Sequence, residues 1–331
     1  MREDSFLKLT GWVETGGKVL SREEILSLLH ENPLALSSFG GEFLLEWDDC
    51  CARDALGIIP GPVPPGKILS GKRLIGSVEP RFGDMGLEEA IVAAVALRSD
   101  RGVVALSGGV DSALVAAIAR RPCIAAGTAE SGDLAMGMGT ARDLGLECIP
   151  AVVAPGELEG AVAKVIGIVP EKTPLDLSIA LSWYFVTRSA RDAGYDRVIT
   201  GQGADELFGG YRRYLESADI DALLADDFAR LPAQVARDQS VAMQNGVLLS
   251  YPYLDGRVVS AARALPAREK VAEGVRKRAL REVAERFLPR EVAWREKKAM
   301  QYGTGIWREL RRLARRKGFP TVKEYLARAV R

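Results

Sequence analysis

The middle of the chain alternates between two hydrophobic patterns. Short apolar runs rich in β-branched residues are typical of buried strands, and longer runs with apolar positions three or four apart are typical of helices. We predict strands at residues 103–106, 123–127, 146–153 and 196–200. We predict helices at 85–98, from 113 onward, and at 134–144, 158–165 and 175–193. Strands that alternate with helices indicate an α/β fold in which helices cover both faces of a parallel sheet.

The N-terminal part, residues 1–80, carries a different pattern. Strands are predicted at 11–14 and 39–48, and the sequence Ser-Arg-Glu-Glu at 21–24 has the spacing of a capping box that opens a helix. A Pro- and Gly-rich piece at 62–66 predicts an irregular connector. We therefore expect a small β-rich domain over residues 1–80.

The C-terminal part is predicted to be nearly all helical. From residue 219 onward there are no strand signals, and residues 251–255 are predicted to form an extended break. The predicted helices lie at 237–246, 258–265 and 276–287, followed by a basic helix at the end. We expect this helical part to belong to a second domain over residues 85–331.

Composition and charge narrow the class of protein. A length of 331 residues suits two domains, and the apolar (47%) and charged (27%) fractions are ordinary for a globular protein. The net charge of +1 gives no global sign of a nucleic-acid or membrane partner. No apolar run reaches the roughly 18 residues that span a bilayer, and the N-terminus has no apolar signal core. We expect a cytoplasmic protein without a membrane partner. The basic terminal helix could contact RNA, but a solvated face suits a neutral chain better, so a nucleic-acid partner is not expected.

The chain offers few residues for a zinc site or for nucleophilic catalysis through cysteine or histidine. Its four cysteines form no Cys-x-x-Cys pair, and its one histidine, His30, ends a predicted helix far away in sequence. A zinc site or a disulfide framework is therefore not expected. Cys123 and Cys148 occupy apolar strand positions and are predicted core residues. Catalysis through a Ser–His or Cys–His pair would depend wholly on His30.

A predicted anion site follows the strand at 103–106. The strand leads into Ser-Gly-Gly-Val-Asp-Ser and then into a helix whose first N–H groups have no intrahelical partner. The paired glycines let the backbone approach a ligand, the serines add hydroxyl donors, and Asp111 can hold Mg²⁺ beside phosphates. A glycine-rich turn that binds nothing is the alternative, and the lack of a lysine excludes a Walker loop. The predicted nucleotide-binding residues here are Leu106, Ser107, Gly108, Gly109, Asp111 and Ser112.

A second loop of the same kind follows the strand at 196–200. Gly201 and Gly203 lead into an acid pair and a helix start. Because ligands bind at the carboxyl ends of parallel strands, Asp111 and Asp205 can both face one magnesium–triphosphate group. Capping of a helix N-terminus is the alternative role for Asp205, and the two roles are compatible. Gly127, at the end of a neighbouring predicted strand, is added to the predicted nucleotide site.

A third candidate lies near the C-terminus, where residues 295–305 predict a glycine-containing loop. The loop carries Lys297 and Lys298, which suit the neutralisation of phosphate charge. A solvated basic surface is the alternative.

These motifs together resemble a known family. Ser-Gly-Gly-x-Asp-Ser resembles the pyrophosphate loop of ATP pyrophosphatases, which split ATP between the α and β phosphates. With the second loop in place, the chain resembles the synthetase half of asparagine synthetase, a group that also includes β-lactam synthetase. The matching positions are 107–112, 201–211, Asp238 with Met243 and Gly246, 252–255, Lys277 with Leu280 and Arg281, Leu288-Pro289, and Arg295 with Lys297. They run over most of residues 85–305, and the resemblance implies an adenine nucleotide α-hydrolase-like fold.

The resemblance also implies a reaction and its participants. Asp111 and Asp205 would hold Mg²⁺, and Lys297 and Lys277 would be the catalytic residues that neutralise the triphosphate and the leaving pyrophosphate of ATP. A small-molecule carboxylate, most simply aspartate, would attack the α-phosphate, and ammonia would then displace AMP from the acyl-adenylate. Such a step needs charge neutralisation and positioning rather than a protein nucleophile.

Two departures from the family pattern matter. The family's glutaminase half begins with a cysteine after the initiator methionine, whereas position 2 here is Arg2 and the first cysteine is Cys50. Residues 1–80 nevertheless retain features of that half, so we expect a reduced glutaminase-like domain without glutaminase activity. Ammonia would come from solution or from a separate glutaminase subunit. In the family pattern Gly-Leu-Glu-x-Arg-x-Pro-Phe-Leu-Asp, Leu248 replaces the acid and Ser250 replaces the arginine.

The second departure leaves the acceptor open. An asparagine synthetase that uses ammonia is the first hypothesis, and the same adenylation chemistry on another carboxylate, giving an amide or lactam, is the second. A tRNA-modifying enzyme would predict paired cysteines and a basic RNA-binding domain, and a non-catalytic protein would predict an eroded loop. The oligomeric state stays open.

Overall fold

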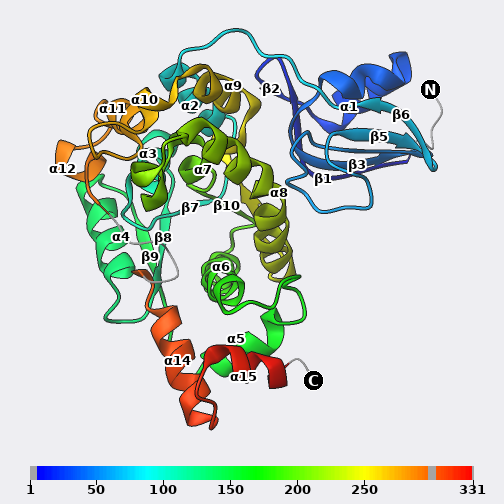
Figure 1. The fold of residues 1–331 in the computed structure, drawn as a ribbon. Coiled ribbons are helices and arrows are strands. Elements are labelled where there is room, and N and C mark those ends of the chain that lie inside the picture. Colours follow the sequence, from blue (N-terminus) through cyan, green and yellow to red (C-terminus); the bar gives the residue numbers. More distant parts are fainter. Residues whose placement is uncertain (1–5, 297–302, 330–331) are drawn as a thin grey trace.

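The computed structural model describes residues 6–296 and 303–329 and contains two β-sheets. Figure 1 shows the N-terminal sheet at one side of the molecule, joined by a long connection to the part that holds the second sheet. The first sheet has six strands in the order β2-β1-β3-β4-β5-β6, and the second has five in the order β11-β10-β7-β8-β9. Within the described ranges, no helix is long and apolar enough to cross a membrane.

The N-terminal sheet is antiparallel, and alternation along its strands divides its residues between two faces. Phe43, Leu45 and Trp47 pack into this sheet's own core, whereas Glu42 points the other way. The predicted capping box at Ser21 is present. The elements are β1 (Leu7–Thr15), β2 (Lys18–Val19), α1 (Arg22–Glu31), η1 (Pro33–Ser38), β3 (Gly40–Trp47), β4 (Cys50–Arg53), β5 (Lys67–Ser70) and β6 (Arg73–Ser77).

The second sheet is parallel, which confirms the predicted α/β class. Successive strand residues enter hydrophobic clusters on opposite faces: Val103 joins one cluster and Val104 the other. The strands are β7 (Val103–Ala105), β8 (Cys123–Gly127), β9 (Cys148–Val152), β10 (Arg197–Ile199) and β11 (Leu248–Ser250).

Helices cover both faces of this sheet, as predicted (Figure 1). One face carries α5 (Leu158–Val165), α6 (Pro174–Asp192), α8 (Ile220–Gln244), α14 (Ile306–Arg316) and α15 (Val322–Ala329). The other carries α2 (Leu87–Ala96), α3 (Val110–Ala119), α4 (Gly132–Asp143), α7 (Ala204–Phe208), α9 (Gly256–Ala264), α11 (Arg278–Ala284) and α12 (Arg290–Ala293). Shorter pieces are η2 (Arg212–Glu216), η3 (Pro252–Leu254) and α10 (Ala267–Lys270).

The prediction of a strand-free C-terminal part was wrong. β11 pairs with β10 in parallel and forms the edge of the sheet. Its three residues are too few to show an alternating pattern, so only pairing with a distant strand defines it. The predicted extended break at 251–255 contains the 3-10 turn η3, and the helix predicted at 237–246 is the end of the longer α8.

Candidate active site

The loop between β7 and α3 is held in shape by its own serines. The backbone N–H of Ser107 donates to Ser112 Oγ at 3.1 Å, and the two hydroxyl oxygens lie 3.0 Å apart. Ser112 Oγ in turn donates to the carbonyl of Gly109 at 3.2 Å. Gly109 is the N-cap of α3 and offers no side chain to the first helical N–H groups. Those N–H groups are therefore left to a ligand, and an anion is the ligand they suit.

Two predicted glycines are required by close packing around this loop. Gly108 has a φ of +75°, and a Cβ there would lie 2.6 Å from the Cβ of Met136. A Cβ on Gly201, after β10, would lie 2.8 Å from the backbone N of Ser112. The loops after β7 and β10 therefore touch through their backbones, which brings the two predicted loops together at one edge of the sheet.

The acids of the two loops meet on one lysine. Lys277 Nζ lies 2.6 Å from Asp111 Oδ2 and 2.7 Å from Asp205 Oδ1. Burial by itself would lower the pKa of the Lys277 ammonium, but the charges of Asp111 and Asp205 raise it above its ordinary value. Lys277 precedes α11 and has a φ of +57°. A residue other than glycine therefore occupies a left-handed backbone conformation, which normally favours glycine. The structure thus brings Asp111 and Asp205 together, as the shared sheet edge predicted, and adds Lys277, which the sequence analysis included only through the family resemblance.

The two carboxylates fit a magnesium ion that is bound together with phosphate. Mg²⁺ in proteins is usually held by one or two carboxylates, with the remaining ligands from substrate phosphates and water. Asp111 and Asp205 lie within reach of a common cation, since both contact the same ammonium. In the part of the chain that the structure describes, no group of three or more His, Cys, Asp or Glu side chains could hold a metal ion. Phosphate oxygens would therefore have to complete the coordination.

Two predicted site residues remain to be placed, Gly127 and Lys297, and one alternative role remains to be checked. Gly127 ends β8 at the same edge, where the following Thr128 N–H donates to the carbonyl of Thr304. Lys297 lies outside the described residues. The alternative role of Asp205 as a helix cap is not seen, because the N-cap of α7 is Gly203, whose φ of +89° admits the turn.

Several residues at this edge belong to the matching positions but were given no role by the sequence reasoning. Tyr253, in η3, donates its hydroxyl to the carbonyl of Asp111 at 3.0 Å. Arg295 lies near the loop after β7 and donates to Thr140 Oγ1 at 3.2 Å. Tyr211 donates to Glu206 at 2.5 Å, and burial together with the charge of Asp205 raises the pKa of Glu206 to about 7. Tyr211 and Glu206 belong to the second loop, and their position there was the available signal.

A buried polar cluster joins the loop after β10 to α8. The amide of Gln202 donates to Asp238 Oδ2 at 2.8 Å, and Arg237 Nε donates to Asp238 Oδ1 at 2.7 Å. Asp238 is fully buried. Gln202 Oε1 is also buried and accepts no hydrogen bond from the described residues.

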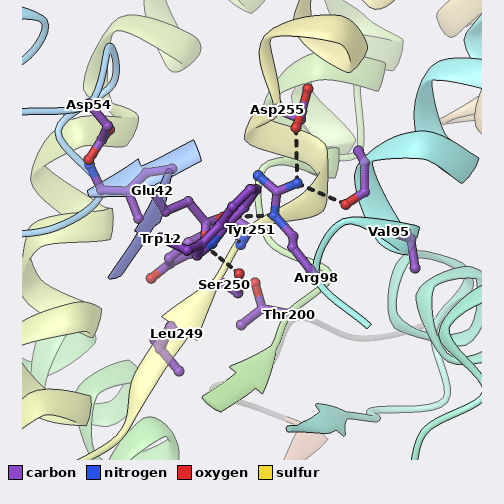
Figure 2. Close-up of polar contacts among 12 residues, drawn as sticks. Trp12, Glu42, Asp54, Val95, Arg98, Thr200, Leu249, Ser250, Tyr251 and Asp255 are labelled. Carbon is purple, nitrogen blue, oxygen red and sulfur yellow. Dashed lines mark hydrogen bonds and ion pairs between the residues drawn. The ribbon is translucent and has the colours of Figure 1, made fainter. Parts of the chain in front are cut away.

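The two positions that depart from the family pattern lie on β11. Leu248 is half-buried and packs against the hydrophobic cluster that includes α6 and α8. Ser250 is buried, and its hydroxyl donates to Glu42 of the N-terminal sheet (Figure 2). Neither side chain presents a charge to the carboxyl edge of the sheet.

The cysteines are not activated thiols. All four are free, and burial raises the pKa of each, in the case of Cys123 to about 12. A thiol is nucleophilic only as the thiolate, so a raised pKa makes it inert. Cys123 is buried in a strand, as predicted, and Cys148 is half-buried.

Comparison with known proteins gives one consistent match. The asparagine synthase domain profile matches residues 86–224 and 219–326. A putative glutamine-hydrolysing asparagine synthetase of Methanocaldococcus jannaschii is 32% identical, over 71% of this chain and 51% of the relative. Asparagine synthetase B of Escherichia coli is 26% identical, over 61% of this chain and 41% of the relative.

Coverage of the relatives is partial. An asparagine synthetase domain-containing protein of Saccharomyces cerevisiae, YML096W, is 31% identical over 40% of this chain and 28% of the relative. The chain spans about half the length of the archaeal relative, and the domain match begins at residue 86, beyond the N-terminal sheet. On the domain match and the archaeal relative, the chain belongs to the asparagine synthase family.

Proposed function

We propose that the chain is an ATP-dependent, AMP-forming carbon–nitrogen ligase that adenylates a carboxylate and transfers ammonia to it. The observation that carries the proposal is the meeting of Asp111, Asp205 and Lys277 beside a backbone anion site at one sheet edge. Two carboxylates and an ammonium at the start of a helix suit the triphosphate of a nucleotide. Membership of the asparagine synthase family supports the same chemistry.

The first step forms an acyl-adenylate. A carboxylate oxygen of the acceptor attacks the α-phosphorus of ATP, the bond to the β-phosphate oxygen breaks, and pyrophosphate leaves. The first N–H groups of α3 and the Lys277 ammonium would stabilise the charge that builds up on the leaving group. Magnesium held by Asp111 and Asp205 would supply further neutralisation of phosphate charge. No side-chain nucleophile is needed, in keeping with cysteines of raised pKa.

The second step releases AMP. The lone pair of ammonia attacks the acyl carbon, the bond to the adenylate oxygen breaks, and the nitrogen loses a proton. That proton passes to solvent water or to the departing AMP phosphate. The inert thiols support a nitrogen supply from free ammonia or from a separate glutaminase subunit.

The acceptor is proposed to be aspartate in the simplest case. An alternative carboxylate is favoured by one observation: Leu248 is apolar and Ser250 is engaged by Glu42, so neither can pair with a charged group of the acceptor. Gln202 Oε1 is buried at the same edge and accepts no hydrogen bond from the described residues. It would receive an N–H donor of the acceptor.

The N-terminal sheet is proposed to be a reduced glutaminase-like domain. Its features include Arg53, which donates to the carbonyls of Gly57 and Ile59, and Asp54, which accepts from the backbone of Ile58. These buried bonds give the segment after β4 a structural role in shaping the loop.

The test is pyrophosphate release from ATP, magnesium and ammonium across a panel of carboxylates led by aspartate. Release with formation of asparagine and AMP would establish the asparagine synthetase activity. Release with another acid alone would keep the adenylation chemistry and change the acceptor. If the protein binds no ATP and releases no pyrophosphate with any acid, the proposal is contradicted.

A further inference from the structure

The N-terminal sheet sends a carboxylate into the interface with the second sheet. Glu42 lies on the face of β3 opposite the core residues Phe43 and Leu45, because alternate strand residues point to opposite faces. Its side chain is 2% exposed. It accepts from Trp12 Nε1 at 3.1 Å, Arg98 Nε at 2.8 Å and the backbone N–H of Tyr251 at 2.7 Å, and also from Ser250 Oγ (Figure 2).

The same interface holds the other end of residues 250–255. Arg98 Nη1 donates to Asp255 Oδ2 at 2.9 Å, and Arg257 Nη1 donates to Asp255 Oδ1 at 3.0 Å. Arg257 also reaches the N-terminal sheet, with Nη2 2.7 Å from Glu14 Oε1. Buried charges are costly unless paired and hydrogen-bonded, and here every one of these groups has partners. Residues 250–255 are therefore fixed at both ends by contacts with the N-terminal sheet or with Arg98.

Between those two ends, the segment contacts both parts of the candidate active site. Tyr253 OH donates to the carbonyl of Asp111 at 3.0 Å. Its ring lies edge-on to Phe208 of α7, the helix that carries Asp205, with centroids 6.1 Å apart. Leu254 packs against Gly203, where a Cβ would lie 2.5 Å from Leu254 Cδ2. A shift of this segment would move both carboxylate-bearing elements.

The serine at position 250 fits this arrangement. Its short side chain leaves the space beside the Glu42 carboxylate to Arg98, which comes from the end of α2. An arginine at position 250, as in the family pattern, would bring a second guanidinium to the same carboxylate. The small residue at position 250 therefore matches the presence of Glu42, whose carboxylate already pairs with Arg98.

We infer that Glu42 is a positioning residue of the ligase: through residues 250–255 it holds the Asp111 loop and α7 in the geometry that binds ATP. The N-terminal sheet then contributes to the geometry of the candidate active site. The expected effect of Glu42 on ATP binding rests on the proposed function. Its expected effect on the loop at residues 107–112 rests on the structure alone.

The experiment compares Glu42→Gln with Glu46→Gln in the full chain. Glu46 lies on the same strand, 30% exposed, in an ion pair with Lys8, so its loss controls for a change of charge on β3. We expect Glu42→Gln to raise the Kd for MgATP about fivefold or more, the low end of common coupling between sites. Amide exchange at residues 107–112 and 203–208 should increase in the same variant without nucleotide. Glu46→Gln should change neither quantity.

Tyr253→Phe removes the far contact without touching the N-terminal sheet. If Glu42 acts through this segment, the double variant with Glu42→Gln should weaken ATP binding by less than the product of the single effects. A merely structural Glu42 would give independent effects. Should Glu42→Gln fail to fold, Ser250→Ala removes one bond to Glu42 and takes its place.

The results separate the two proposals. Wild-type protein that binds no ATP would contradict the proposed function, and amide exchange would still test the coupling. An unchanged exchange rate at residues 107–112 in Glu42→Gln, or an unchanged Kd for ATP, would overturn the inference.

Discussion

The buried guanidinium of Arg98 provides a demanding test of the interface, through the substitution Arg98→Met. Arg98 is 1% exposed and joins the carboxylates of Glu42 and Asp255, at 2.8 and 2.9 Å, to the carbonyl of Ala94 at 2.8 Å. The buried group contains three carboxylates (with Glu14) and two guanidinium ions (with Arg257), a net charge of −1. Methionine fills a similar volume without charge, so the net charge becomes −2.

The expected loss in free energy of unfolding depends on the hydrogen-bond donors that Glu42 and Asp255 retain without Arg98. Removing one partner of a buried ion pair costs about 3–5 kcal/mol, because it leaves a charge without compensation. Glu42 retains three other donors and Asp255 retains Arg257, so we expect a loss near the lower end, about 3 kcal/mol. Replacing both charges of a buried pair costs less than breaking it, so Glu42→Gln added to Arg98→Met should cost less than the sum of the two single changes.

Urea unfolding at pH 7, followed by tryptophan fluorescence and circular dichroism, measures these free energies. Arg101→Met is the matched control, since Arg101 is exposed and pairs loosely with Asp196 at 3.5 Å. Its loss should cost no more than about 0.5 kcal/mol. A cost below about 1 kcal/mol for Arg98→Met, or additive single effects in the double variant, would refute the reasoning.

Four further predictions concern the candidate active site. Asp111→Asn should abolish pyrophosphate release while the protein still folds, with a free energy of unfolding lower by at most about 3 kcal/mol, because the buried Lys277 ammonium loses one of its two carboxylate partners and keeps Asp205. Wild-type turnover would contradict its role. Lys277→Gln should raise the KM for ATP and lower kcat, and Lys277→Arg, which keeps the charge, should lose less; equal losses would argue against charge neutralisation. Gly201→Ala should weaken ATP binding, since its Cβ would lie 2.8 Å from the backbone N of Ser112, and an unchanged Kd would show that the loops need no close contact. Burial, with the charge of Asp205, raises the pKa of Glu206 from 4.5 to about 7, so the folded protein keeps a proton that the unfolded chain loses between pH 4.5 and 7. The free energy of unfolding should therefore fall by about 3 kcal/mol as pH rises through that window, and Glu206→Gln should remove most of this fall in urea unfolding at pH 5 and 8.

The sequence determined the elements that depend on local pattern. Hydrophobic periodicity located β7, β8 and α5 closely, and the capping box at Ser21 located α1, because these signals lie within a few residues of one another. The paired glycines and the acid of residues 107–112 marked the predicted anion site for the same reason. Placing Asp111 and Asp205 at one sheet edge needed only the rule that parallel strands share their carboxyl ends.

Tertiary structure decided the contacts between distant residues. β11 exists because Leu248–Ser250 pairs with β10, and three residues carry too little local preference to form a strand alone. Lys277 meets Asp111 across 166 positions of sequence, and Glu42 meets Tyr251 across 209. A side chain's partners over such separations depend on how the sheets and helices pack, since local periodicity fixes only the face on which a residue lies. The sequence by itself therefore located the two glycine-rich loops, and only the folded chain showed the contacts that link them, through residues 250–255, to the N-terminal sheet.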